Sequence, residues 1–365
     1  MRRISIKLDV TYPEERVNTS DSNSTYYVTA EEIAAIPLAV LRKYEEDAKE
    51  NPWRALDEER AQDIHIRNWP PYVFADTRTF IGAAMRAHYQ PLDAQEEVFR
   101  RSQTLIVLGP WRITRGVYCF DEALSSALAE TDPADQIPID VLLRLPEWAV
   151  CIFGKSLSID GTIVCAFASI SHDHRNSIDS MSLLMVHKDA SQSIITLQLT
   201  PGVTVASNVA KALGNIHKTE GSQNDAADMV SNERRIADTT SRILAHVLYL
   251  CANEPDLSST PHPHPNPRKT KFGPRFFPPE NGNQVITVGA RFGSMFRRTR
   301  EEFAAAEQHA RTGRTMPPHW RKAHWRSYLT GPRKPGPQIR IVKWIAPTFV
   351  NAIADELPVT IRSVS

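Results

Sequence analysis

Histidine and tryptophan alternate with arginine and lysine in one stretch near the C-terminus, PPHWRKAHWR at residues 317–326. Aromatic rings stack on bases and arginine binds phosphate, so single-stranded RNA is one ligand class that fits. Trp and Arg also anchor protein interfaces, so a peptide partner fits equally well. A third interpretation is that the Trp rings pack into the C-terminal region and hold His and Arg in a turn. The residues expected to bind a partner here are His319, Trp320, Arg321, His324, Trp325, Arg326 and, further along, Trp344.

The other candidate sites lack essential parts. His172 and His174 follow a predicted strand and could share a metal ion, but only Asp179 and His187 offer further ligands. A polar turn between strands is the simpler interpretation. Gly154-Lys155-Ser156 also follows a strand, but a phosphate-binding loop needs a glycine where the chain has Ala149. We therefore expect no catalytic residue, no metal site and no cofactor. A metal-dependent nuclease using these histidines or the His319/His324 pair is a weaker alternative, because no acidic metal cluster is visible.

Charge is distributed unevenly along the 365 residues, although the net charge is only +1. Residues 266–343 contain 17 Lys and Arg against 4 Asp and Glu, whereas residues 1–265 contain 25 against 36. A basic region of this size can bind phosphates, an acidic partner, or the acidic body of its own chain. The sequence shows neither a secretory signal nor an apolar run long enough to span a bilayer, so we expect a cytoplasmic protein that does not enter membranes.

The elements that must position these residues suggest an α+β fold. Four runs rich in β-branched and aromatic residues, at 148–153, 162–171, 180–187 and 193–199, predict an antiparallel meander flanked by helices. Helices are expected at 30–48, 95–108 with an end at Gly109-Pro110, 205–213, 226–253 and 294–310. Strands are expected at 4–10, 284–288 and 339–345, and a loop or short helix at 317–325. Eight prolines between residues 255 and 279 predict a linker or an extended arm.

These elements predict four regions: an N-terminal helical and strand segment at 1–90, a central α+β domain at 91–256, a proline-rich linker or arm at 257–283, and a small basic α+β region at 284–365.

Islands of sequence between about residues 95 and 350 resemble one known family. It is the family of large anti-CRISPR proteins directed against the type V-A effector nuclease, with relatives on plasmids and phages. The islands are Leu105-x-x-Leu108-Gly109-Pro110-Trp111-Arg112, Gly116-Val117-Tyr118, Asp121-Glu122, Leu145-Pro146-Glu147-Trp148-Ala149-Val150, Leu250-Cys251-Ala252-Asn253-Glu254-Pro255-Asp256, Gly289-Ala290-Arg291-Phe292-Gly293, Pro318-His319-Trp320-Arg321-Lys322-Ala323-His324-Trp325 and Trp344-Ile345-x-Pro347.

The resemblance implies a non-enzymatic protein of the bacterial cytoplasm. Such a protein binds a polypeptide segment of the effector nuclease, which in some members is the nascent N-terminal part, and the nuclease's message and protein are then lost. Messenger RNA and the ribosome are implied as further partners. From residue type we add Trp111, Arg112 and Trp148 as contacts in a central groove. The alternative function is an RNA-binding regulator or replication accessory protein of a mobile element. The oligomeric state stays open.

Overall fold

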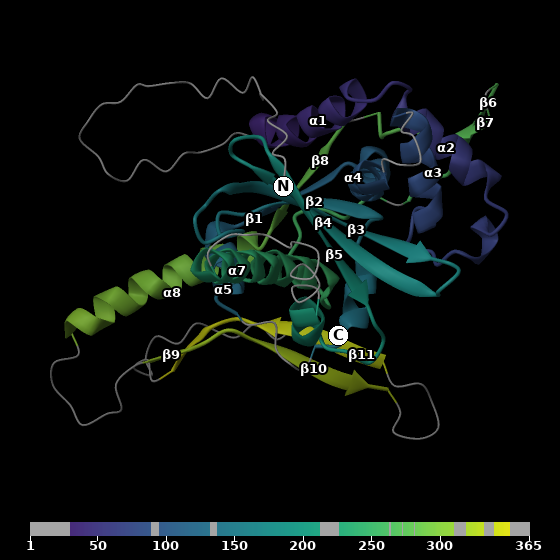
Figure 1. Ribbon diagram of the computed structural model, residues 1–365. Helices are drawn as coiled ribbons and strands as arrows, with labels where there is room; N and C mark the ends of the chain where they lie inside the picture. The colour runs from purple at the N-terminus through teal and green to yellow at the C-terminus, as the bar shows by residue number, and fades with distance from the viewer. Residues whose placement is uncertain are drawn as a thin grey trace, which may run out of the picture.

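The computed structural model describes residues 30–88, 95–131, 137–211 and 226–350, except residues 263, 272, 281, 310–318 and 332–338. The strand expected at residues 4–10 lies outside the described part. A six-stranded sheet forms the centre, with helices on both of its faces (Figure 1). This arrangement confirms the α+β class predicted from the sequence.

The strands of the main sheet follow the order β5-β4-β3-β2-β1-β8. Strands β2 to β5 are each antiparallel to the next, which is the expected meander. Strand β1 differs because it runs parallel to both β2 and β8. Parallel neighbours need crossover connections, and helices supply them here. The bounds are β1 (Gly116–Phe120), β2 (Ala149–Phe153), β3 (Ile163–Asp173), β4 (Ile178–His187), β5 (Gln192–Leu199) and β8 (Gln284–Val288).

Apolar side chains on the two faces of this sheet belong to two separate clusters. The first face is covered by α1 (Ala30–Glu46), α2 (Pro52–Gln62), α3 (Thr77–His88) and α4 (Gln95–Thr114). The second face is covered by α5 (Glu122–Ala129), the short η2 helix (Ile139–Arg144), the helical residues 205–211 and α7 (Ala226–Cys251). None of the helices within the described ranges combines the length and apolar character needed to cross a bilayer.

Helix α4 continues through Gly109-Pro110, where the sequence predicted that it would end. Its last turn carries Trp111 and Ile113, both fully buried, and this packing outweighs the backbone hydrogen bond that Pro110 cannot make. Gly109 is there for a close approach rather than for a helix end, because an added Cβ would lie 2.5 Å from Cδ2 of Leu56 on α2. The helix ends one turn later at Arg115, whose φ of 55° is left-handed.

The proline-rich segment forms an extended arm against the first face of the sheet. It contains one small hairpin, β6 (Arg268–Thr270) and β7 (Gly273–Arg275), and then Phe276, which is buried in the cluster on that face. Beyond the arm, β8 pairs with β1 of the main sheet. The division of the chain into four regions stays a prediction, and its C-terminal region includes this strand of the central sheet.

The last helix and the last strands lie beyond the second face of the sheet (Figure 1). Helix α8 (Ala290–His309) begins four residues earlier than predicted and packs against α5. The loop or short helix expected at residues 317–325 is wrong, because its described part forms strands β9 (His319–Arg321) and β10 (His324–Thr330). These pair with β12 (Thr348–Val350) and β11 (Ile339–Ile345). The paired residues are 9 to 31 positions apart in the chain, and such pairing is not visible in a local sequence pattern.

Candidate partner-binding surface

Strands β9 to β12 together form one long antiparallel ribbon, which we call the C-terminal ribbon. β9 pairs with β12 and β10 pairs with β11, and the two pairs are joined by residues 322–323 on one side and 346–347 on the other. The alternating His, Trp and Arg residues at 319–326 therefore lie along one side of this ribbon. The structure brings seven of the ten expected binding residues together here, namely His319, Trp320, Arg321, His324, Trp325, Arg326 and Trp344.

The inner face of the ribbon is anchored on the core. Trp325 and Trp344 are directly opposite each other in the β10–β11 register, and Trp325 is only 5% exposed. The ring of Trp344 makes edge contacts with Tyr249 of α7 and Phe292 of α8, at centroid distances of 5.9 and 5.1 Å. Its indole Nε1 donates to Thr131 Oγ1 at 3.3 Å. These two tryptophans therefore fix the ribbon to the body. The structural interpretation of the segment expected packed Trp rings, but it placed them in the C-terminal region with His and Arg in a turn, whereas these His and Arg residues lie on strands.

The outer face of the ribbon carries the polar and basic side chains. Successive residues of a strand point to opposite faces, so His324, Arg326 and Tyr328 lie on the face opposite Trp325. The Arg326 guanidinium carbon lies 4.9 Å from the centroid of the Tyr328 ring, a cation–π contact. Lys343 lies opposite Arg326 in the register and reaches Glu254 Oε2 at 3.2 Å. The outer face thus presents guanidinium, ammonium and aromatic groups side by side.

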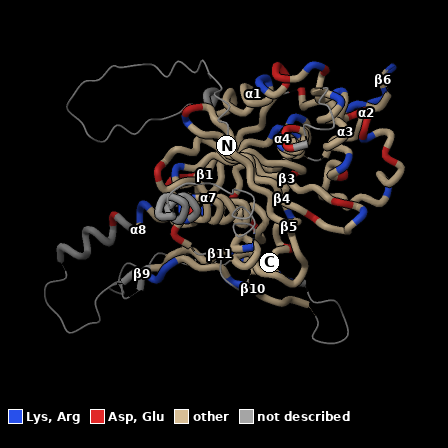
Figure 2. Tube along the Cα trace, in the orientation of Figure 1, with Lys and Arg blue, Asp and Glu red and all other residues tan. Residues whose placement is uncertain are grey.

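Charge on the ribbon has one sign. Residues 319–350 contain seven Lys and Arg and no Asp or Glu. Figure 2 shows the resulting blue segments on β9 and β10. Within the described part of the chain, Arg321, Lys322 and Arg326 make no ion pair, and all three are exposed. The ribbon therefore has three basic groups that no acidic residue in the described part of the protein neutralises.

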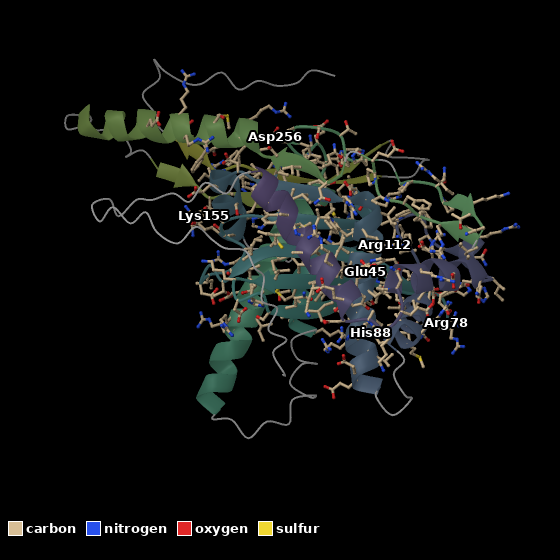
Figure 3. All side chains as sticks on the ribbon, turned by 90° about the horizontal axis from the view of Figure 1, so that it is seen from above. Glu45, Arg78, His88, Arg112, Lys155 and Asp256 are labelled. Atoms are coloured by element: carbon tan, nitrogen blue, oxygen red, sulfur yellow. The ribbon has the colours of Figure 1, made fainter. Side chains whose placement is uncertain are left out.

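Other basic residues of the C-terminal part are held by the acidic body. Asp256 lies at the N-terminal end of α8 (Figure 3), where its Oδ2 accepts from the backbone N–H of Arg291 at 2.9 Å. Its Oδ1 accepts from Arg291 Nε at 2.6 Å. Arg297, six residues further along α8, pairs with Asp121 at 2.9 Å. Docking of the basic region on its own body, one of three roles considered for it, thus accounts for these arginines but not for those of the ribbon.

Trp111 and Arg112 lie elsewhere and are both buried inside the body of the molecule. Figure 3 labels Arg112. The Trp111 side chain is fully buried, and its Nε1 donates to the carbonyl of Gly116 at 2.9 Å. Arg112 is ion-paired with Asp57 of α2, and its Nη1 donates to the carbonyl of Phe276 at 3.3 Å. The two side chains hold helices and the arm together and offer no free surface here, so contact with a partner through them stays a prediction.

Trp148 is also a packing residue in this structure. It is 7% exposed, and its ring stacks on His264 of the arm at a centroid distance of 4.2 Å. Burial lowers the pKa of His264, so the ring stays neutral and stacks as an apolar surface. Trp148 and Trp111 belong to the cluster on the first face of the sheet, whereas the ribbon packs on the second. The ten residues therefore form two separate groups.

The histidines considered as metal ligands have other partners. His172 Nδ1 lies 2.8 Å from Asp179 Oδ1, and Tyr72 donates to the other oxygen of that carboxylate at 2.9 Å. The ring of His174 stacks on His65 at 4.3 Å. In the described ranges, no three His, Cys, Asp or Glu side chains lie close enough to hold one metal ion. His172 and Asp179 therefore join the ends of β3 and β4.

Two buried polar pairs were not predicted from the sequence. Tyr118 donates to Glu147 Oε1 at 2.8 Å, and burial raises the pKa of Glu147 to about 7. Ser125 Oγ lies 2.9 Å from His246 Nε2, and burial lowers the pKa of His246 to about 4. His246 Nδ1 is 2.7 Å from the carbonyl of Arg242, so that nitrogen carries the proton and Ser125 donates to Nε2. Both pairs lie on the second face of the sheet, where they hold strands and helices together.

Comparison with known proteins identifies the family of this chain. The sequence profile of the AcrVA2-like family, the anti-CRISPR type V subtype A2 family, matches residues 118–352, which is more than half of the chain. The crystal structure of AcrVA2 is similar to this structure with a TM-score of 0.58, covering 86% of this chain and 98% of that one at 22% sequence identity. That likeness shows a shared fold. A search of curated protein sequences finds no match. The chain belongs to the anti-CRISPR type V subtype A2 family.

Proposed function

We propose that this protein recognises a polypeptide segment of a type V-A CRISPR effector nuclease as the segment emerges from the ribosome, and thereby lowers production of the nuclease. The observation that carries the proposal is the family match over residues 118–352, which covers the main sheet from the middle of β1 and the whole described ribbon. Anti-CRISPR activity follows from the family. Recognition of the emerging chain is the finer step that we add.

The proposal assigns no bond-breaking step to the protein. Its buried serine and histidine, Ser125 and His246, hydrogen-bond to each other within the core, and Ser125 is fully buried. His172 is engaged by Asp179. These contacts support a protein that acts by binding, with loss of the message carried out by enzymes of the host.

An extended peptide can be recognised by adding a strand to a sheet edge. Strand β5 is the last strand of the described sheet and hydrogen-bonds to β4. Three of its side chains, those of Ile195, Leu197 and Leu199, are buried, so the edge is held firmly by the core. This geometry supports recognition of a peptide through its main-chain groups.

Co-expression with a type V-A nuclease tests the proposal. The nuclease gene is supplied in its natural codons, in recoded codons that keep the N-terminal amino acids, and with those amino acids replaced. We expect protein and message of the first two to fall together and those of the third to persist. If recoding alone protects the message, the nucleotide sequence is recognised instead, and the proposal is contradicted.

A reconstituted translation reaction separates binding from catalysis. Purified protein is added to nuclease message in a system of defined components without host ribonucleases. We expect the message to stay intact and the protein to be retained on ribosomes that carry the nascent nuclease. Cleavage of the message by the purified protein, lost in a His172→Ala or His324→Ala variant, would support the metal-dependent nuclease alternative and contradict the proposal.

The second candidate function is an RNA-binding regulator of a mobile element, and the unneutralised charge of the C-terminal ribbon favours it. It predicts that none of the three nuclease genes is affected in the co-expression experiment.

A further inference from the structure

We propose that the outer face of the C-terminal ribbon is a docking surface for single-stranded RNA. The inference does not depend on recognition of a nuclease polypeptide, because it rests on the geometry and charge of strands β9 to β11 alone.

The first support is the difference between the two faces of the ribbon, one packed on the body and the other carrying polar and basic residues. Trp325, Val342 and Trp344 pack on the body and fix the ribbon, while His324, Arg326 and Tyr328 are placed on the other side. The ribbon lies at the side of the molecule opposite α1 and α4, beyond α7 (Figure 1). Its outer face is therefore rigidly presented by a folded core, which lowers the entropy cost of binding.

Charge identifies the kind of partner. Strands β9 to β12, with residues 322–323 and 346–347 that join the two pairs, carry five basic residues, Arg321, Lys322, Arg326, Arg340 and Lys343, and no acidic ones. Arg321 and Lys322 precede β10 in the chain and are exposed, and neither they nor Arg326 have an acidic partner among the described residues. A group of unneutralised cations of this kind attracts a polyanion that can release its counterions, as nucleic acids do.

The stacked pair of Arg326 and Tyr328 favours single strands over duplexes. A guanidinium plane and an aromatic ring both stack on bases, and only unpaired bases expose their faces for such contacts. The seven residues of β10 span about 20 Å, enough for a short run of nucleotides. Most single-stranded nucleic acid in a cell is RNA, which makes RNA the occupant to test.

Binding is measured by fluorescence anisotropy with a labelled, unstructured 20-nucleotide RNA and the full-length protein. In the double variant Arg321→Gln/Arg326→Gln we expect about a tenfold loss of affinity at 0.1 M salt. The slope of log affinity against log salt should fall by about 1.4, because each phosphate contact with a single strand contributes about 0.7. The matched control is Arg268→Gln/Lys269→Gln on the β6–β7 hairpin, which removes the same charge elsewhere and should leave affinity unchanged.

The stacking contact is tested at Tyr328. Tyr328→Phe keeps the ring and should retain affinity, whereas Tyr328→Leu should lose about tenfold. The proposal would be overturned if the ribbon double variant and its hairpin control lost affinity equally, or if Tyr328→Phe and Tyr328→Leu did. It would also be overturned if the protein bound duplex DNA more tightly than RNA, or if polyglutamate competed for the protein as well as unlabelled RNA does.

The ribbon double variant is also tested in the co-expression experiment. If it has lost RNA affinity but still lowers the nuclease, recognition of the polypeptide stands without RNA.

Discussion

The guanidinium of Arg112 on α4 is ion-paired with the carboxylate of Asp57 on α2, and both side chains are buried. Asp57 Oδ2 also accepts from the backbone N–H of Phe276 at 3.3 Å. Two charges thus join α4, α2 and the proline-rich arm at one point. A buried pair of this kind is costly to break, because removing one partner leaves the other charge without compensation.

We therefore expect Arg112→Met to lower the free energy of unfolding by about 3–5 kcal/mol, as measured by urea denaturation. The double variant Asp57→Leu/Arg112→Met should recover most of this loss because no lone charge remains. The control is Arg100→Ala, which breaks the partly exposed pair with Glu97 and should cost less than about 1 kcal/mol. If Arg112→Met costs no more than this control, the pair does not hold the three elements together.

Much of the fold could be predicted from local pattern, and the failures have a common cause. The runs that became β2 to β5 and the spacing that became α7 depend on which residues face the core, and a short window of sequence contains that information. The sequence predicts an end of helix α4 that is too early, because a Gly-Pro pair such as Gly109-Pro110 usually marks a helix end when only its neighbours are considered. Only the approach of Leu56, from a helix more than 40 residues earlier, explains why glycine stands there.

For the candidate site, too, the sequence indicated the segment but not the role of each residue in it. Residue type correctly drew attention to the segment that forms the C-terminal ribbon. It could not separate Trp325, which anchors the ribbon, from its exposed neighbour Arg326, because the alternation of faces depends on strand pairing. Likewise, nothing near Arg112 in the sequence indicates Asp57, which lies 55 positions away. Long-range pairs of this kind need the fold before they can be seen.

Two helical glycines provide a matched test of close packing. Gly293 of α8 faces Asp121, and an added Cβ would overlap the carboxylate that caps α5. Gly82 of α3 faces only the flexible end of Glu59, at 3.1 Å. We expect Gly293→Ala to lower the free energy of unfolding by about 1–3 kcal/mol, because the added methyl group overpacks this contact. Gly82→Ala should be neutral or stabilising by up to about 1 kcal/mol, since alanine favours the helix. Equal effects in calorimetry would contradict the packing of α8 on α5.

Glu147 should make stability depend on pH. Burial raises its pKa in the folded protein from the ordinary value near 4.5 to about 7. The unfolded chain therefore releases this proton at lower pH, and stability falls as pH rises from about 4.5 to 7. The difference between the folded and unfolded pKa values corresponds to about 3 kcal/mol. In Glu147→Gln this fall should disappear.

Urea unfolding of wild type and Glu147→Gln at several pH values between 4.5 and 8 measures the effect. The difference between the two proteins is the informative quantity, because His246 and His88 act in the opposite direction. Burial lowers the pKa of both histidines to about 4, so their contribution is lost as pH falls below about 6.5. Parallel curves for wild type and variant would show that Glu147 does not titrate in this range.

Two adjacent residues of β10 should lose very different amounts of stability when each is replaced by alanine. Trp325 is 5% exposed and packs in the core, so Trp325→Ala should cost about 3–5 kcal/mol of unfolding free energy. Arg326 is exposed, and its guanidinium lies over the Tyr328 ring at the surface, so Arg326→Ala should change stability by less than about 0.5 kcal/mol. Urea denaturation of both variants checks the assignment of faces. A large loss in Arg326→Ala would mean that the outer face is itself a packing surface, and the ribbon would then have no free side for a partner.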